Sequence, residues 1–454
     1  MDSRTVPPTT SRRVVAIPYP GRGHINPMLN FCQLLASRAR DVQVTVIVTE
    51  EWLGLIGAAN ENPAMKENMC FVTIPNVLPS EKVRGADLAG FMEAVLEKME
   101  EPVERVLERI EKPVAAMIAD SFVPWAVGLG RKWSAPVASF WSPSVSCFTM
   151  FFHYHLLVNH RHYPVDPSGG GEEARIDYIP GIPSIRISDL PNAFRANKQR
   201  YLRVILQVIS TATKARCLVF RSIRKLEPCP IDALSSILPI PIYPVGPAIP
   251  YPKLSGPFPD PSYDYLQWLN SQARSSVLYV SLGSYLSTSP GQMEELAAGL
   301  RDSRVPFLWV AKDTSSSFKD RLIIPWCDQL KVLTHPSVGG FLTHCGWNSC
   351  LESAFAGVPV LTFPLSADQP VNRKVVVEDW QTGWRMEGTG EAGTVVGRKE
   401  IAETVKRFMD LESPNRVKLG AQARELREKS RLAVAEDGVS EANFNAFLSE
   451  FLRC

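Results

Sequence analysis

The feature that most constrains the fold of this chain is a repeated alternation of short apolar runs with longer amphipathic segments. The apolar runs have the length of buried strands and lie at residues 14–18, 42–48, 114–119, 137–141, 217–220, 277–281, 307–310, 322–324, 340–343 and 358–363. Segments with apolar residues at helical spacing separate them, at 25–38, 89–111, 201–215, 292–302, 347–355 and 371–378. Buried strands that alternate with helices form parallel, doubly wound sheets. The chain is therefore predicted to be an α/β protein.

A proline-rich stretch interrupts this alternation once, at 241–262. Because proline lacks a backbone donor, the stretch is typical of an interdomain linker. We therefore expect one Rossmann-like domain over 1–240 and a second over 263–454, with a crevice between them. The last stretch of the second domain, 401–452, is charged and predicted to be helical. Doubly wound sheets bind ligands at the carboxyl ends of their strands. Polar side chains that directly follow the apolar runs are therefore the candidate site residues.

The composition argues against several classes of protein. The 454 residues carry 49 basic against 47 acidic side chains, without the basic excess of a nucleic-acid or acidic-membrane binder. No stretch approaches the roughly 20 apolar residues of a membrane helix, and residues 1–13 lack the apolar core of a signal peptide. Nine cysteines without a C-x-x-C motif fit reduced thiols. We expect a cytoplasmic protein that does not span a membrane and is a monomer.

A histidine follows the first apolar run. Residues 19–27 read Tyr-Pro-Gly-Arg-Gly-His-Ile-Asn-Pro, which places His24 where a strand gives way to a helix. Gly21 and Gly23 permit a tight turn, and the positive end of the helix dipole favours the uncharged imidazole that a general base requires. Asp120 also ends a predicted strand, and a carboxylate there can orient the imidazole. Helix capping by each residue is the alternative interpretation.

The densest group of polar residues lies between 326 and 369. The strand predicted at 340–343 runs directly into a helix, and a helix N-terminus at this place is a ready site for phosphate. His344, Asn348 and Ser349 add side-chain donors beside it. The order of strand, donors and helix therefore predicts a diphosphate site.

Other residues of this stretch fit the remaining parts of a nucleotide sugar. Glu352 lies one turn into the helix, where its carboxylate can accept from ribose hydroxyls. Asp368 and Gln369 follow the next strand and can both accept from and donate to sugar hydroxyls. Trp326 offers an aromatic face to a base.

Each of these residues also has an ordinary structural interpretation. His335 and His344 lack a third metal ligand at a usual spacing. Cys345 and His344 are adjacent on a strand end and point apart, which disfavours a nucleophile pair. Trp347 fits a hydrophobic core. Their joint arrangement is what favours a ligand site.

The stretch from Trp326 to Gln369 resembles the signature box of the plant family-1 UDP-dependent glycosyltransferases, which act on secondary metabolites. Both run for 44 residues. The resemblance covers essentially the whole chain and includes further matches at Gly23-His24, at Asp120, at 179–183 with Ser188-Asp-Leu-Pro191, and at 279–284. Residues 325–329 and 377–385 indicate the subgroup numbered 87.

The resemblance implies a GT-B fold, in which two Rossmann-like domains face a central crevice and C-terminal helices follow. The first domain would bind the acceptor and the second the UDP-sugar. The implied enzyme is an inverting, metal-independent hexosyltransferase without a cofactor. Its co-substrate would be UDP-glucose, because the box ends in Gln369 whereas galactose users often carry His. By the same likeness His24 deprotonates the acceptor and Asp120 supports His24.

The resemblance also assigns the donor contacts. The base would be held by Trp326, Cys327 and Gln329, the ribose by Glu352, the diphosphate by Ser284, His344, Gly346, Asn348 and Ser349, and the sugar by Ser142, Trp347, Asp368 and Gln369. The sequence departs from the family pattern at Leu282, where many members have Phe, and in the short segment 311–321. Neither departure removes a catalytic group.

The acceptor site carries no motif. Four aromatic residues, Phe122, Trp125, Trp141 and Phe148, are expected to line an apolar pocket, and a core position is the alternative for each. Phenolic, flavonoid, terpenoid and hormone acceptors all fit, through O, N, S or C. Two other functions remain as alternatives: a non-catalytic UDP-sugar binder, and an NAD(P)-dependent oxidoreductase that would use Glu50 or Glu51 but has only an incomplete glycine pattern at 21–26.

Overall fold

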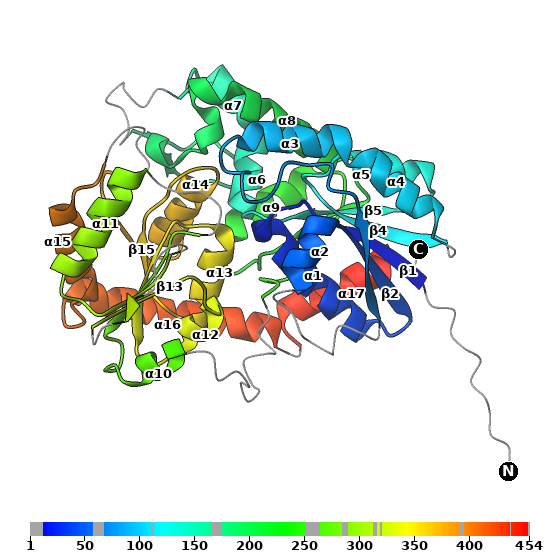
Figure 1. The fold of residues 1–454 in the computed structure, drawn as a ribbon. Helices are drawn as coiled ribbons and strands as arrows, with labels where there is room; N and C mark the ends of the chain where they lie inside the picture. Colours follow the sequence, from blue (N-terminus) through cyan, green and yellow to red (C-terminus); the bar gives the residue numbers. More distant parts are fainter. Residues whose placement is uncertain are drawn as a thin grey trace, which may run out of the picture.

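The computed structural model describes residues 12–57, 68–110, 113–165, 174–249, 264–283, 289–311, 316–317, 320–389, 395–435 and 437–452. They form two lobes, each built on a seven-stranded sheet with helices packed against it (Figure 1). We call the lobe around the sheet that contains the N-terminal strands the first domain and the other lobe the second domain. The predicted α/β architecture of two doubly wound sheets is confirmed.

The first sheet is parallel and has the order β3-β2-β1-β4-β5-β8-β9. Its strands are β1 (Arg12–Ile17), β2 (Val42–Thr49), β3 (Met69–Ile74), β4 (Val114–Asp120), β5 (Val137–Trp141), β8 (Cys217–Phe220) and β9 (Ile242–Pro244). The main helices around it are α1 (Arg22–Arg38), α2 (Glu50–Gly57), α3 (Leu88–Lys98), α4 (Glu100–Glu108), α5 (Trp125–Lys132), α6 (Val145–Phe152), α7 (Tyr154–Asn159), α8 (Gln199–Ala212) and α9 (Pro228–Ile237). Nearly all residues of the central strands are buried, as expected for a sheet covered on both faces.

The second sheet has the order β12-β13-β11-β10-β14-β15-β16, and only the short β12 runs antiparallel. Its strands are β10 (Val277–Ser281), β11 (Phe307–Val310), β12 (Ser316–Ser317), β13 (Arg321–Ile324), β14 (Val338–Thr343), β15 (Val360–Thr362) and β16 (Gly383–Arg385). Helix α10 (Asp264–Asn270) precedes β10, and the helices among the strands are α11 (Pro290–Asp302), α12 (Gln329–Thr334), α13 (Trp347–Ala356), α14 (Gln369–Lys374) and the π-helical turn η6 (Val375–Asp379).

Several expected boundaries are corrected by the structure. The first helix begins at Arg22 rather than residue 25, because Gly21 is the N-cap and its carbonyl accepts from the N–H groups of His24 and Ile25 at 2.9 Å each. The helix expected at 89–111 is two helices, α3 and α4, since Pro102 cannot donate to the carbonyl four residues earlier. The start of the expected linker belongs to the first sheet as β9, and residues 250–263 lie outside the described part.

The C-terminal stretch forms three helices that connect the domains again. They are α15 (Arg398–Met409), α16 (Pro414–Val434) and α17 (Val439–Phe451). Helix α16 packs its Leu426 and Ala433 with the second domain, whereas α17 buries Phe444 and Phe447 in the core of the first domain. The expectation that all of 263–454 belongs to one domain therefore fails at this last helix. In the part of the chain that the structure describes, no helix combines the length and apolar character needed to cross a membrane.

The carboxyl ends of strands from both sheets meet between the domains. The Asn348 amide nitrogen donates to the Gly23 carbonyl at 3.4 Å, and the Trp347 indole donates to the Arg221 carbonyl at 3.4 Å. The Ser144 hydroxyl donates to Asn372 Oδ1 at 2.8 Å. Residues that follow β1, β5, β8, β14 and β15 are thereby brought to one interdomain region.

Candidate active site

His24 and Asp120 form a hydrogen-bonded pair at the carboxyl edge of the first sheet. His24 Nδ1 lies 2.9 Å from Asp120 Oδ2. The same carboxylate accepts from the Ser142 hydroxyl at 3.0 Å and from the Phe122 backbone N–H at 2.9 Å, and Asp120 is buried. A carboxylate bound at Nδ1 assigns the imidazole proton to that nitrogen and leaves a lone pair on Nε2. Ser142, which the resemblance assigned to the sugar, is thus bonded to Asp120.

An aromatic cluster packs around His24. The Tyr19 and Phe122 rings lie 4.8 and 4.9 Å from the imidazole, between centroids. Phe122 stacks on Trp141 at 5.4 Å, and Trp141 meets Phe148 edge-on at 5.1 Å. Among the four residues expected to line the acceptor pocket, Phe122 is therefore the one packed against His24.

The other expected acceptor residues lie deeper. Trp141 and Phe148 have no exposed surface. Trp125 is buried as well, and its indole donates to the Val95 carbonyl in α3 at 3.1 Å. These three side chains pack the core beneath the site rather than present a face to solvent.

The predicted diphosphate turn follows β14. The His344 ring lies between two glycines, since a Cβ on Gly283 or Gly346 would come within 2.7 or 2.5 Å of its Nε2. Burial lowers the pKa of His344 to about 4, so its ring is neutral near pH 7. Cys345 has a φ of 64°, a left-handed conformation that is costly for a residue with a Cβ and occurs often at ligand-binding turns. Ser284, also expected here, lies outside the described residues.

Helix α13 begins at this turn, and its first residues contact the first domain. Asn348 Oδ1 accepts from Arg221 Nη1 at 2.6 Å, while its amide nitrogen faces the turn that carries His24. The Trp347 side chain is buried and donates to the Arg221 carbonyl, so any contact of this residue with a sugar would come from its backbone. Ser349 is also buried, with its hydroxyl accepting from Gln329 at 3.1 Å.

Arg221 is a site residue that the sequence analysis missed. It is 1% exposed and donates to the carbonyls of Ser142 and Pro247 at 3.1 Å each. Its buried Nε has no hydrogen-bond partner, and it forms no ion pair within the described ranges. Burial lowers the pKa of Arg221 to about 9, which the charges of Glu352 and Asp120 partly oppose. Its position directly after a buried strand, comparable to that of Asp120 at the end of β4, is the signal that could have identified it.

The expected base residues lie just before and at the start of α12, and Gln329 joins this helix to Glu352 in α13. The Gln329 amide donates to Glu352 Oε2 at 2.8 Å and accepts from the Tyr279 hydroxyl at 3.2 Å. Burial raises the pKa of Glu352 to about 7. Trp326 is 51% exposed, so its ring is accessible to a ligand, whereas the Cys327 side chain is buried.

The expected sugar residues lie in a turn after β15. Gln369 Oε1 accepts from the N–H groups of Leu365 and Ser366 at 2.7 and 2.9 Å, which leaves its amide nitrogen for other contacts. Asp368 Oδ2 accepts from Asn372 at 2.8 Å. Burial raises the pKa of Asp368. Ala367 has a φ of 58°, a second strained position at the site.

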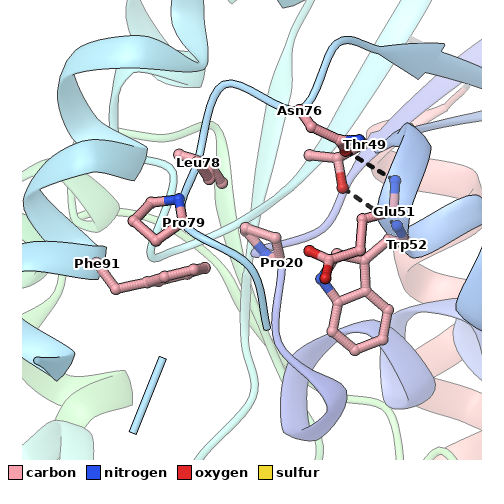
Figure 2. A pocket seen from close by; sticks show the side chains of 8 residues that line it. All are labelled: Pro20, Thr49, Glu51, Trp52, Asn76, Leu78, Pro79 and Phe91. Atoms are coloured by element: carbon pink, nitrogen blue, oxygen red, sulfur yellow. Dashed lines mark hydrogen bonds between the residues drawn. The ribbon is translucent and has the colours of Figure 1, made fainter. Parts of the chain in front are cut away.

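A small hollow lies beside the turn that leads to His24 (Figure 2). Its lining comes from residues that follow β1, β2 and β3 and from the helices α2 and α3: Pro20, Thr49, Glu51, Trp52, Asn76, Leu78, Pro79 and Phe91. The Glu51 carboxylate accepts from the Ser80 hydroxyl and from the Glu81 backbone N–H at 3.1 Å. Glu51 therefore anchors the loop after β3, a structural role that does not require a cofactor ribose.

Metal ligands do not cluster in the described part of the chain. Across the described ranges, no group of three or more His, Cys, Asp or Glu side chains is arranged to hold a metal ion. His335 instead bonds to Ser337 at 2.8 Å and Asn270 at 3.0 Å.

Comparisons with known proteins agree with this arrangement. The model of the family "UDP-glucoronosyl and UDP-glucosyl transferase" matches residues 253–389. UDP-glycosyltransferase 87A2 of Arabidopsis thaliana is 45% identical over 455 residues, which cover 99% of this chain and 98% of that protein.

Two solved structures with bound ligands share the fold over nearly the whole chain. The structure of Medicago truncatula UGT71G1 complexed with UDP-glucose has a TM-score of 0.82 and 25% identity, over 98% of this chain and 99% of that one. The structure of Phytolacca americana UGT2 complexed with UDP-2fluoro-glucose and pterostilbene has a TM-score of 0.80 and 27% identity, over 97% of this chain and 100% of that one. With its two facing Rossmann-like domains and a full-length relative at 45% identity, this chain belongs to the UDP-glycosyltransferase enzymes, in the subgroup numbered 87.

Proposed function

We propose that the protein transfers glucose from UDP-glucose to a hydroxyl of a small apolar acceptor, with inversion at the anomeric carbon and without a metal ion. The observation that carries this proposal is the pair of His24 and Asp120, joined at 2.9 Å next to the turn that Asn348 of the second domain contacts. A base on one side of the crevice and a diphosphate turn on the other suit a single in-line displacement.

His24 is the general base of the proposed reaction. Nε2 takes the proton of the acceptor hydroxyl as the oxygen attacks C1 of glucose. The resulting imidazolium is stabilised by the Asp120 carboxylate, which keeps the proton of Nδ1 in place. The new C1–O bond forms on the face opposite the leaving group, which inverts the anomeric configuration.

The leaving group is UDP, which departs with the electron pair of the C1–O bond. Its charge would be met by the backbone N–H groups at the start of α13 and by the donors of Asn348 and Ser349. The buried cation of Arg221, which already bonds Asn348 at 2.6 Å, adds positive charge on the side of the first domain. His344 is neutral and would act as a hydrogen-bond donor.

The acceptor class follows from the surroundings of His24. Phe122 and Tyr19 pack against the imidazole, so the group next to the base is apolar and flat. Aromatic rings of this kind favour a planar acceptor such as a phenol, and pterostilbene in the Phytolacca americana structure is one such compound. Terpenoid alcohols and hormones are the further classes to test.

The test is the release of UDP from UDP-glucose in the presence of a pooled panel of phenols and terpenoid alcohols. His24→Ala is expected to lose about 10²–10⁴-fold in turnover while it still binds UDP, because the base contacts only the acceptor. His335→Ala is the matched control, because it removes another imidazole, one bonded to Ser337 and Asn270 away from the crevice.

Three outcomes distinguish the functions. Acceptor-dependent release that His24→Ala abolishes and His335→Ala retains supports the transferase. Near-normal turnover of His24→Ala would contradict the proposal that His24 is the general base. Calorimetric binding of UDP-glucose without release for any acceptor would favour the non-catalytic binder.

A further inference from the structure

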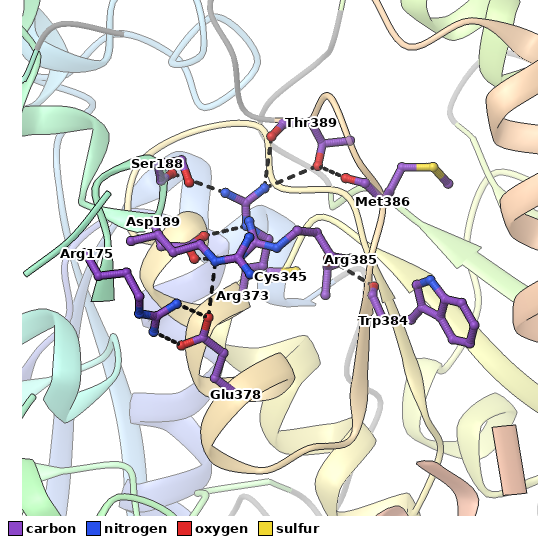
Figure 3. A network of polar contacts seen from close by, with 12 residues as sticks. Arg175, Ser188, Asp189, Cys345, Arg373, Glu378, Trp384, Arg385, Met386 and Thr389 are labelled. Atoms are coloured by element: carbon purple, nitrogen blue, oxygen red, sulfur yellow. Dashed lines mark hydrogen bonds and ion pairs between the residues drawn. The ribbon is translucent and has the colours of Figure 1, made fainter. Parts of the chain in front are cut away.

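A buried cluster of charged side chains joins the two domains (Figure 3). It lies near the turn of Asp368 and Gln369 after β15, which we call the sugar turn. Asp189, the last residue of the short helix η2 (Ile187–Asp189) in the first domain, has no exposed surface. Its carboxylate accepts from Arg373 Nε at 2.6 Å and from Arg385 Nη2 at 2.5 Å. Arg373 lies in α14 and Arg385 in β16. One carboxylate of the first domain thus holds two elements of the second.

The Arg373 side chain is held at every nitrogen. Beyond the bond to Asp189, Nη1 donates to the Thr389 carbonyl at 2.9 Å and to its hydroxyl at 3.3 Å, and Nη2 donates to the Ser188 carbonyl at 3.1 Å. Arg373 is 2% exposed, so water does not weaken these contacts. A guanidinium bonded on all sides fixes the direction of the helix that carries it.

Helix α14 carries the sugar turn. It begins at Gln369, directly after Asp368, and Arg373 lies one turn further along. The intervening Asn372 donates to Asp368 at 2.8 Å and to the Cys345 carbonyl at 3.0 Å. The position of Arg373 therefore determines where Asp368 and Gln369 point.

The first domain contacts the same turn at two further places. The backbone N–H of Asn192 donates to the Ala367 carbonyl at 3.3 Å, and the Ser144 hydroxyl donates to Asn372 at 2.8 Å. The segment after Asp189 also packs on the acceptor side, where Phe194 meets Phe151 of α6 at 5.1 Å. The Asp189 segment therefore links the walls of the acceptor side to the sugar turn.

We propose that Asp189 is a positioning residue for sugar transfer, which acts through Arg373 to fix Asp368 and Gln369 relative to His24. This inference rests on the proposed function, because it assumes that Asp368 and Gln369 hold the donor sugar. Asp189 itself touches no substrate. Its contribution is geometric, and a shift of the sugar by about 1 Å is enough to cost a large factor in rate.

The test compares two carboxylate-to-amide substitutions at ion pairs that both cross between the domains. Asp189→Asn removes the charge that holds Arg373 and Arg385. Glu378→Gln is the matched control, because Glu378 also pairs with the first domain, through Arg175 at 3.0 and 2.5 Å. Glu378 is partly exposed and lies in η6, beyond the C-terminal end of α14 and away from the sugar turn at its start.

Three quantities are measured for each variant: the Kd for UDP, the selectivity for UDP-glucose over UDP-galactose, and kcat with an acceptor found in the panel. Asp189→Asn is expected to keep its Kd for UDP within about twofold, to lower kcat by about 10–100-fold, and to reduce the selectivity for UDP-glucose over UDP-galactose. Glu378→Gln is expected to match the wild type in all three.

The outcomes separate this inference from the proposed function. A wild type that neither binds UDP-glucose nor releases UDP rejects the proposed function and the inference with it. A functional wild type with an equally active and selective Asp189→Asn variant rejects the inference alone, as does a parallel loss of UDP binding, which would indicate a general structural role. If Asp189→Asn does not fold, Arg385→Met tests the link between Asp189 and the second domain, because it removes one of the two arginines and leaves Asp189 paired with Arg373. We expect a smaller loss in kcat for this variant, at unchanged affinity for UDP.

Discussion

Single polar residues at the ends of buried strands make up much of the proposed site. Asp120 ends β4, Arg221 follows β8 and His344 follows β14. Asp120 and Arg221 are buried, and His344 is partly buried. Asp120 accepts three hydrogen bonds, whereas burial lowers the pKa of both Arg221 and His344. Burial at a strand end therefore holds a charge or an imidazole in place before a ligand arrives.

The sequence indicated which single residues belong to the candidate site, but not which side chains pair across distant parts of the chain. His24 and Asp120 could be proposed because each follows an apolar run, and the structure places them 2.9 Å apart. The pairing of Asp189 with Arg373 could not be read from the sequence, because 184 positions separate them and no local spacing relates them. Their roles in the reaction stay predictions.

The Arg221 side chain leads to a prediction about phosphate binding. Arg221→Met removes the cation but keeps an apolar chain of similar length, which a buried position tolerates. We expect the Kd for UDP to rise by about 10–100-fold, the value of a lost charge-assisted hydrogen bond, while the Kd for uridine changes little. Calorimetry with UDP and with uridine measures both. Equal weakening for the two ligands would show that Arg221 acts on the nucleoside side or on folding.

Among the elements, those with a strong sequence signal were predicted best. The strands β5, β8, β10 and β11 coincide with the expected apolar runs. The edge strands β3 and β16 were missed; both are only partly buried, and β16 has only three residues. The break between α3 and α4 was missed because the apolar pattern continues through it, although Pro102 marked the place.

The start of α13 gives a prediction at the level of the element. Gly346→Ala would bring a methyl group to 2.5 Å from His344 Nε2, so the imidazole must move out of its position between the glycines. Overpacking of this kind costs about 1–3 kcal/mol, and we expect it as weaker UDP binding. Gly291→Ala in α11 is the control, because a Cβ there meets no atom within 4 Å. Unchanged UDP affinity of Gly346→Ala would argue against the expected role of this turn.

Across the described helices and strands, the chain passes from one domain to the other twice. The first crossing lies between β9 and α10, and the second between α16 and α17. Helix α17 buries Phe444 and Phe447 against Phe31 of α1, with ring centroids 5.6 Å apart in each case. The first domain therefore owes part of its core to the end of the chain.

This packing predicts how the stability of the first domain depends on the last helix. Phe447→Ala is expected to lower the free energy of unfolding by about 3–5 kcal/mol, since the ring is fully buried. Val439→Ala in the same helix is the control, because Val439 is largely exposed and should cost little. Urea unfolding followed by aromatic fluorescence measures both. A Phe447→Ala variant as stable as Val439→Ala would show that the first core does not need α17.

The double crossing has a consequence for how the enzyme can be divided. A break engineered into the first connection would not free the lobes, because α17 would remain seated in the first core and the buried contact of Asp189 with Arg373 would persist. The two fragments should then assemble into a noncovalent complex of complementary halves. Such a split enzyme would allow one half to be isotopically labelled while the other stays invisible to NMR, so that each lobe could be followed separately.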